Sequence, residues 1–136
     1  MTFQHLTSGK TIKILNTHLD RASNNSRVRS VELILRTLMT ETDTTPTILL
    51  GDFNAPFDDE IILRIKEFFK DAYQGDELEG CTFHRWNGGS HCERIDYIFY
   101  GNSEKFSLSS FKIDQWKSKQ LYPSDHYPLV ATFQLK

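Results

Sequence analysis

The feature that most constrains this chain is a repeated arrangement in which polar residues stand directly beside apolar, strand-like segments. There are four such groups, namely Asn-Thr-His-Leu-Asp at 16–20, Gly-Asp-Phe-Asn-Ala at 51–55, Arg-Ile-Asp-Tyr at 94–97 and Ser-Asp-His-Tyr-Pro at 124–128. Binding side chains in open sheets gather beyond the ends of neighbouring strands. The sequence therefore predicts that these polar side chains converge at one end of one sheet.

The remaining segments predict a mixture of strands and helices. Apolar runs and alternating patterns predict strands at residues 3–6, 11–17, 47–50, 82–84, 95–100, 106–113 and 129–135. One amphipathic segment predicts a helix from Asn25 or Ser26 to about Met39, and Pro56 and Asp58 open a second helix. Because strands and helices are mixed and most of the helix comes early, we expect an α/β or α+β layered sandwich.

Length and charge narrow the classes of function. The 136 residues fit one domain, and no apolar run reaches the roughly eighteen residues of a membrane span. With 16 basic and 18 acidic residues, the net charge of −2 lacks the basic stripe of a non-specific DNA binder. A phosphoester hydrolase is not excluded, because divalent metal can neutralise its carboxylates. The N-terminus does not resemble a signal peptide, so we expect a cytoplasmic location if Met1 is the natural start.

The two cysteines, Cys81 and Cys92, are too few to crosslink a chain of this size. We expect free thiols, with a disulfide between them as an alternative. A zinc site formed by these cysteines with His84 and His91 is a further alternative. Its spacing disfavours it, because the adjacent His91 and Cys92 would have difficulty reaching one tetrahedral ion.

Each polar group, taken singly, also has an ordinary structural explanation. His18 can be an edge histidine, and Asp52 and Asn54 can be turn residues. Asp96 is harder to explain in this way, because it lies in an apolar strand and a buried carboxylate is costly unless paired. We therefore expect a histidine or arginine from a neighbouring strand end beside Asp96.

Together and in this order, the four groups resemble the endonuclease/exonuclease/phosphatase superfamily, which includes deoxyribonuclease I, exonuclease III-like endonucleases, sphingomyelinases and inositol polyphosphate 5-phosphatases. The resemblance runs from Phe3 to the C-terminus and rests most on Gly-Asp-Phe-Asn at 51–54 and Ser-Asp-His-x-Pro at 124–128. It implies one domain, the C-terminal half of a four-layer α/β/β/α sandwich. The expected sheet is mixed and mostly antiparallel, with two main helices on one face.

The resemblance implies a phosphate-binding and metal-binding group near the C-terminus. Asp125 would hold Mg²⁺ or Mn²⁺, hard cations that prefer oxygen ligands. His126 would contact the scissile phosphate, and Asp96 would orient the ring of His126.

The resemblance also implies catalytic roles for residues that follow the first two strands. Asp52 would position or deprotonate the attacking water, or protonate the leaving oxygen. Asn54 would donate its amide to a phosphate oxygen and hold Asp52 in place. His18 would be a second phosphate contact.

The chain departs from the superfamily because the N-terminal half, with its metal-binding glutamate, is absent. A metal held by Asp125 alone would be bound weakly, so activity of the isolated chain is doubtful. The leading hypothesis is a metal-dependent phosphoester hydrolase, a nuclease, phosphodiesterase or phosphatase, or the catalytic half of one. The alternative is a non-catalytic truncated remnant that binds a phosphorylated ligand or a partner protein.

The substrate would be nucleic acid or a small phosphorylated molecule. His84 and Trp86 can stack on a base or sugar, and Arg27 can reach a distal phosphate. The ordinary alternatives are a loop-anchoring role for Trp86 and a solvated helix face for Arg27.

Three predicted strands, at 11–17, 95–100 and 129–135, offer apolar residues on both faces, whereas helices can cover only one face. The resemblance implies that the missing half packs on the second face. We therefore predict a homodimer packed sheet against sheet through that exposed face. The alternative is that loops such as residues 81–92 cover it.

Overall fold

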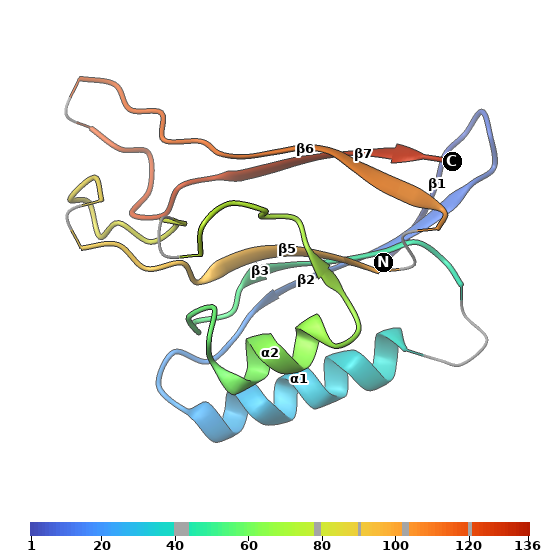
Figure 1. Ribbon diagram of the computed structural model, residues 1–136, viewed down its shortest axis with the longest axis horizontal. Coiled ribbons are helices and arrows are strands. Elements are labelled where there is room, and N and C mark those ends of the chain that lie inside the picture. The colour runs from blue at the N-terminus through green and yellow to red at the C-terminus, as the bar shows by residue number, and fades with distance from the viewer. Residues whose placement is uncertain (40–43, 78–79, 90, 102–103, 120) are drawn as a thin grey trace.

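The computed structural model describes residues 1–39, 44–77, 80–89, 91–101, 104–119 and 121–136. They form three layers, in which two helices pack under a larger sheet and a two-stranded ribbon lies over it (Figure 1). In chain order the elements are β1 (Thr2–Gln4), β2 (Thr11–His18), α1 (Asn24–Leu38), β3 (Thr47–Asp52), α2 (Glu60–Lys66), β4 (Lys70–Asp71), β5 (Asp96–Gly101), β6 (Phe106–Ile113) and β7 (Leu129–Leu135).

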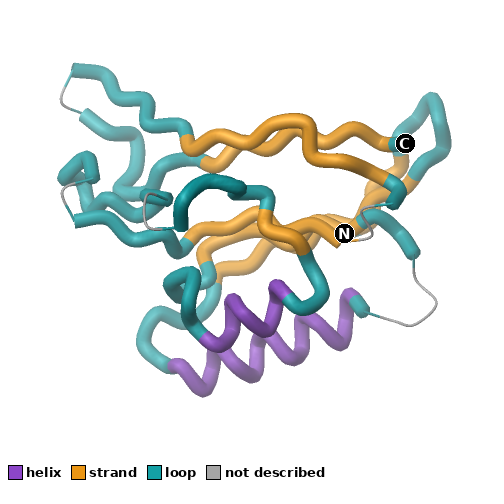
Figure 2. Tube along the Cα trace, in the orientation of Figure 1, coloured by secondary structure: helices purple, strands orange, loops and turns teal. Residues whose placement is uncertain are grey.

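The larger sheet has the strand order β1-β2-β3-β5-β4. The pair β2–β3 is parallel and is connected through α1, while β1–β2, β3–β5 and β4–β5 are antiparallel. The ribbon is the antiparallel pair β6–β7. The predicted mixed, mostly antiparallel sheet with both helices on one face is confirmed, as Figure 2 shows.

Capping side chains fix where the helices begin. The hydroxyl of Ser23 accepts a hydrogen bond from the Ser26 amide, so α1 starts one or two residues before the predicted Asn25 or Ser26. The carboxylate of Asp59 accepts from the Ile61 amide and caps α2 in the same way. The helices bury one apolar face against the sheet, in a core that includes Val31, Leu35, Leu49, Phe53, Ile61, Ile62, Ile65 and Phe99. In the described part of the chain, no helix is long and apolar enough to cross a membrane.

The second face of the larger sheet is covered by the chain itself. Ile98 and Tyr100 of β5 are buried against Phe106 and Phe133 of the β6–β7 ribbon. The expectation that this face is exposed is therefore wrong, because the last two strands fold back over it. Loops of residues 81–92 are not its main cover either. The predicted homodimer loses this surface as its basis, and the oligomeric state stays a prediction.

The segment around residues 81–93 differs from the prediction in two respects. Residues 82–84 do not form a full strand; Phe83 makes isolated bridges to Glu93 and His126. Cys81 and Cys92 form a disulfide, with 5.3 Å between their Cα atoms, so the expectation of free thiols is wrong. The pairing of Phe83 with Glu93 brings the cysteines together. A zinc site with His84 and His91 is excluded as well, because the disulfide uses both sulfur atoms.

Candidate functional site

Strand register brings three of the predicted site residues to one end of the larger sheet. The end of β2, the end of β3 and the start of β5 lie at the left of Figure 1. His18, the last residue of β2, pairs with Asp52, the last residue of β3. Asp52 in turn pairs with Asp96, the first residue of β5. Parallel and antiparallel pairing thus set these residues side by side, although they lie far apart in the sequence.

Asp96 and His126 form a hydrogen-bonded pair. The Nδ1 atom of His126, in the loop before β7, lies 2.8 Å from the Oδ2 atom of Asp96, so the predicted contact is present. The ring of Phe83 lies against the ring of His126, with centroids 4.7 Å apart. Burial raises the pKa of the Asp96 carboxyl, and hydrogen bonds from His126 and Thr82 oppose that shift. The pair therefore satisfies a largely buried carboxylate.

The carboxylate of Asp52 is held on both sides. Its Oδ1 accepts a hydrogen bond from the main-chain amide of Asn54 at 2.8 Å, and its Oδ2 lies 3.4 Å from His18 Nε2. Asn54 takes the left-handed conformation at φ 49°, which asparagine tolerates better than most residues. The side-chain nitrogen of Asn54 donates to the Leu19 carbonyl at 2.9 Å. His18 is the exposed member of the pair, with 74% of its side chain accessible to solvent.

Among the described residues, one group has the composition and spacing of a metal site. Asp52, Asp96 and His126 each place a ligand atom within 4.8 Å of the others. Carboxylate oxygens suit a hard divalent cation, so these residues fit the predicted Mg²⁺ or Mn²⁺ by their chemistry. Asp125, the predicted metal ligand, is not in this group. Its main-chain carbonyl accepts hydrogen bonds from the amides of His84 and Arg85.

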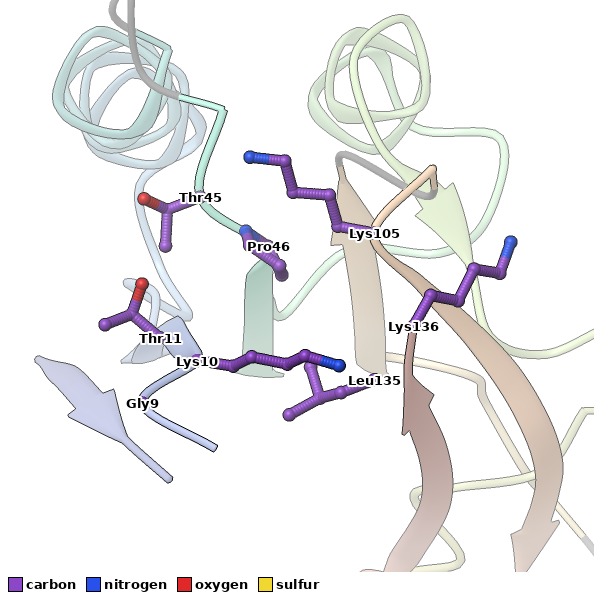
Figure 3. A pocket seen from close by; sticks show the side chains of 8 residues that line it. All are labelled: Gly9, Lys10, Thr11, Thr45, Pro46, Lys105, Leu135 and Lys136. Carbon is purple, nitrogen blue, oxygen red and sulfur yellow. The ribbon is translucent and has the colours of Figure 1, made fainter. Parts of the chain in front are cut away.

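Two cavities lie at opposite ends of the molecule. One of about 360 Å³ opens beside Asp96 and His126 and is also lined by Gly51, Ser124 and Pro128. The other, of about 420 Å³, is lined by Gly9, Lys10, Thr11, Thr45, Pro46, Lys105, Leu135 and Lys136 (Figure 3). The residues that line the second cavity include no aspartate, glutamate or histidine. The groups suited to proton transfer are therefore those of the first cavity.

The chain matches the Endonuclease/Exonuclease/phosphatase family over residues 3–126, which is most of its length. The chain belongs to this family. A search of curated proteins gave no match.

Three solved structures share the fold of this chain. An endonuclease/exonuclease/phosphatase from Bacteroides vulgatus is 29% identical, with a TM-score of 0.84 over 99% of this chain and 54% of its own. A functionally unknown conserved protein from Enterococcus faecalis is 26% identical, with a TM-score of 0.81 over 96% of this chain and 52% of its own. A mannosyl-6-phosphatase from Bacteroides thetaiotaomicron is 22% identical, with a TM-score of 0.82 over 97% of this chain and 54% of its own, and shows the fold alone. The chain thus spans about half the length of these three structures.

The three residues predicted to contact substrate, His84, Trp86 and Arg27, lie in different surroundings. His84 is fully buried between the rings of Tyr122 and Tyr127, so the prediction that it stacks on substrate is wrong for this structure. Trp86 is 57% exposed in the adjacent loop. The guanidinium of Arg27 donates to main-chain carbonyls before α1 and to Asn24, so it stabilises the start of that helix.

Sequence reasoning missed one residue of the site. Thr82 is fully buried, and its hydroxyl oxygen accepts hydrogen bonds from the amides of Ile95 and Asp96. The available signal was its place at the start of the strand predicted at residues 82–84. Its significance depends on the tertiary contact with β5, which periodicity does not predict.

Proposed function

We propose that this chain carries the catalytic residues of a metal-dependent phosphoester hydrolase. One observation carries the proposal: the hydrogen-bonded Asp96–His126 pair stands beside the Asp52 carboxylate at the end of the larger sheet. Family membership supports the reaction class, since the family comprises nucleases and phosphatases. The chain spans about half of its structural relatives, so the extent of its own activity is part of the proposal.

His126 and Asp96 would act on the phosphate. The bond from Nδ1 to Asp96 fixes the ring and leaves Nε2 as the nitrogen that donates to a phosphoryl oxygen. A hydrogen-bond donor fixed at this position suits the negative charge that develops on those oxygens. Asn54 and the largely exposed His18 would supply further donors at the same edge.

Asp52 would act on the water or on the leaving group. It either takes a proton from the attacking water while the new P–O bond forms, or donates one to the oxygen whose bond to phosphorus breaks. The main-chain amide of Asn54 donates to the Asp52 carboxylate at 2.8 Å and orients it for either role. This residue is therefore the one whose amide variant tests the chemistry most directly.

A divalent cation would be held by the carboxylates of Asp52 and Asp96, with Asp125 as the further predicted ligand. Bound there, Mg²⁺ or Mn²⁺ would neutralise charge on the phosphoryl oxygens. With few protein ligands the cation would bind weakly, so it should stabilise the fold only at high concentration.

The substrate would be nucleic acid or a small phosphorylated molecule. One relative that shares the fold is named a mannosyl-6-phosphatase, which is a precedent for the small-molecule class. The net charge of −2 also gives no general attraction for a polyanion. We therefore favour a small phosphorylated molecule over nucleic acid as the substrate.

The test is hydrolysis of p-nitrophenyl phosphate and bis(p-nitrophenyl) phosphate by the purified chain, with Mg²⁺ or Mn²⁺. We expect slow, metal-dependent turnover that is lost in Asp52→Asn and in His126→Gln. Asp58→Asn, an exposed aspartate outside the site, is the matched control and should keep the wild-type rate. Turnover that persists in Asp52→Asn would refute the assignment. Saturable phosphate binding without any turnover would instead favour the non-catalytic alternative.

A further inference from the structure

The segments that carry Asp96 and His126 are connected through a third segment. In the described part of the chain, no main-chain hydrogen bond joins residues 94–97 directly to residues 124–128. Residues 124–128 bond to residues 82–85 through the main chain: the Tyr127 amide donates to the Thr82 carbonyl at 2.7 Å, and the His84 amide donates to the Asp125 carbonyl at 2.9 Å. Residues 94–97 bond to the same segment through the side chain of Thr82. The relative position of the Asp96–His126 pair therefore depends on this intervening strand-like segment.

Thr82 makes the connection to both sides. Its hydroxyl oxygen accepts from the Ile95 amide at 3.0 Å and from the Asp96 amide at 3.1 Å. Its carbonyl accepts from Tyr127, the residue that follows His126. A single buried residue thus bonds to the backbone of one partner through its side chain and to the neighbour of the other through its main chain.

Thr82 is itself held in place by contacts with the segment at Cys92 and Glu93. Its amide and that of Phe83 donate to the Glu93 carbonyl at 3.0 and 2.9 Å, and the adjacent Cys81 is crosslinked to Cys92. The hydroxyl donates to the same Glu93 carbonyl at 3.4 Å. A side chain fixed in this way can transmit its position to Asp96.

We propose that Thr82 is a positioning residue, which sets the distance and orientation of Asp96 relative to His126 without touching substrate. This inference rests on the proposed function for its catalytic meaning, but its geometric content stands independently. Valine has nearly the shape of threonine and lacks the hydroxyl, so Thr82→Val would leave two buried amides without an acceptor and would loosen the pair. Serine keeps the hydroxyl, so Thr82→Ser should preserve the pair.

The matched control is Thr47→Val at the other end of the same sheet. Thr47 is also a buried threonine, its hydroxyl donates to the Thr45 carbonyl at 2.9 Å, and it pairs with Gly101 at the far end of β5. This variant loses one buried hydroxyl from the same sheet without altering the site. It separates a general loss of packing from an effect on the Asp96–His126 pair.

The primary measurement is the proton NMR signal of the His126 ring N–H that is shared with Asp96, recorded on the intact chain without metal. We expect the downfield signal in the wild type, Thr82→Ser and Thr47→Val, and its loss or broadening in Thr82→Val. An unchanged signal in Thr82→Val would overturn the proposal. If Thr82→Val does not fold, Thr82→Ser decides: a folded Thr82→Ser that lacks the signal would overturn it too, and one that keeps the signal supports it.

The secondary measurement is kinetic and distinguishes this inference from the proposed function. We expect kcat of Thr82→Val to fall by about tenfold to a hundredfold with KM nearly unchanged, as when an outer partner of a site histidine is removed. An inactive wild type with the NMR pattern intact would refute the proposed function but not the positioning role. An active wild type with an unchanged kcat in folded Thr82→Val would refute the positioning role alone.

Discussion

Arg94 is the charged side chain whose removal should cost this fold the most. Its guanidinium forms ion pairs with Asp71 and with Glu77, and only 3% of the Arg94 side chain and 9% of that of Asp71 are exposed. The guanidinium also lies between two aromatic rings, 4.6 Å from the centroid of Tyr73 and 4.4 Å from that of Tyr97. These contacts connect β4 and the segment after it to Arg94, which lies two residues before Asp96 at the start of β5.

The perturbation is Arg94→Met, which keeps most of the volume and removes the charge. It leaves Asp71 buried without its main partner, and breaking a buried pair from one side costs about 3–5 kcal/mol. A domain of this size is stable by roughly 5–15 kcal/mol, so the variant should fold with a much lower urea midpoint. The double variant Arg94→Met with Asp71→Asn should recover part of the loss, because it no longer buries an unpaired carboxylate.

The loss should also depend on pH in a defined direction. Burial already raises the pKa of Asp71 above its ordinary 3.8, and Arg94 opposes that shift. Without Arg94 the pKa of Asp71 rises further, so between pH 3.8 and that raised pKa the folded variant binds a proton that the unfolded chain does not. Its stability relative to wild type therefore improves as the pH falls through this window and is lowest at neutral pH.

The assay is urea unfolding followed by circular dichroism at pH 7 and pH 5, with Arg64→Met as the matched control. Arg64 pairs with Glu32 and Glu67 on the surface, so the same substitution there should move the midpoint little. The reasoning would be refuted by an Arg94→Met midpoint close to that of Arg64→Met. A loss that is as large at pH 5 as at pH 7 would refute the role given to Asp71.

Three further predictions concern other contacts. Reduction of the Cys81–Cys92 disulfide, which closes a loop of sequence separation 11, should lower the free energy of unfolding by about 3 kcal/mol, measured by urea unfolding with and without reductant; an unchanged midpoint with both thiols titratable would contradict this. Gly51→Ala should destabilise the fold by more than the roughly 1–3 kcal/mol of backbone strain alone, because Gly51 has φ 136° and an added Cβ would lie 1.8 Å from the Thr17 carbonyl oxygen; a wild-type melting temperature would refute it. Mg²⁺ should raise the melting temperature only at high concentration and not in Asp52→Asn, whereas an equal rise in that variant would place the ion elsewhere.

Local patterns predicted most of the elements and the strand-end geometry. The bounds of β6 and β7 agree with the strands predicted at 106–113 and 129–135. Burial alternates along β7, as its sequence predicts, whereas a register shift between Leu108 and Ser110 interrupts the alternation in β6. The convergence of His18, Asp52 and Asp96 followed from polar groups placed at strand ends.

The errors share a different cause, which is dependence on contacts between distant segments. Periodicity does not indicate that the β6–β7 ribbon folds over the larger sheet, so the covered face was predicted to be exposed. Composition favoured free thiols, whereas the bridge between Phe83 and Glu93 decides the disulfide. His84 was assigned to substrate by its loop position, but Tyr122 and Tyr127 enclose it.

The wide separation in sequence of the site residues has a consequence for folding kinetics. His18 and His126 lie near opposite ends of the sequence, and the parallel pair β2–β3 forms only after the chain has crossed over through α1. Non-local pairings of this kind slow folding, because chain entropy is lost before the contacts form. The site should therefore appear last and all at once. A ligand that binds at the site would therefore bind only chains that have completed folding. It would not bind partly folded chains, so its binding would report the end of folding.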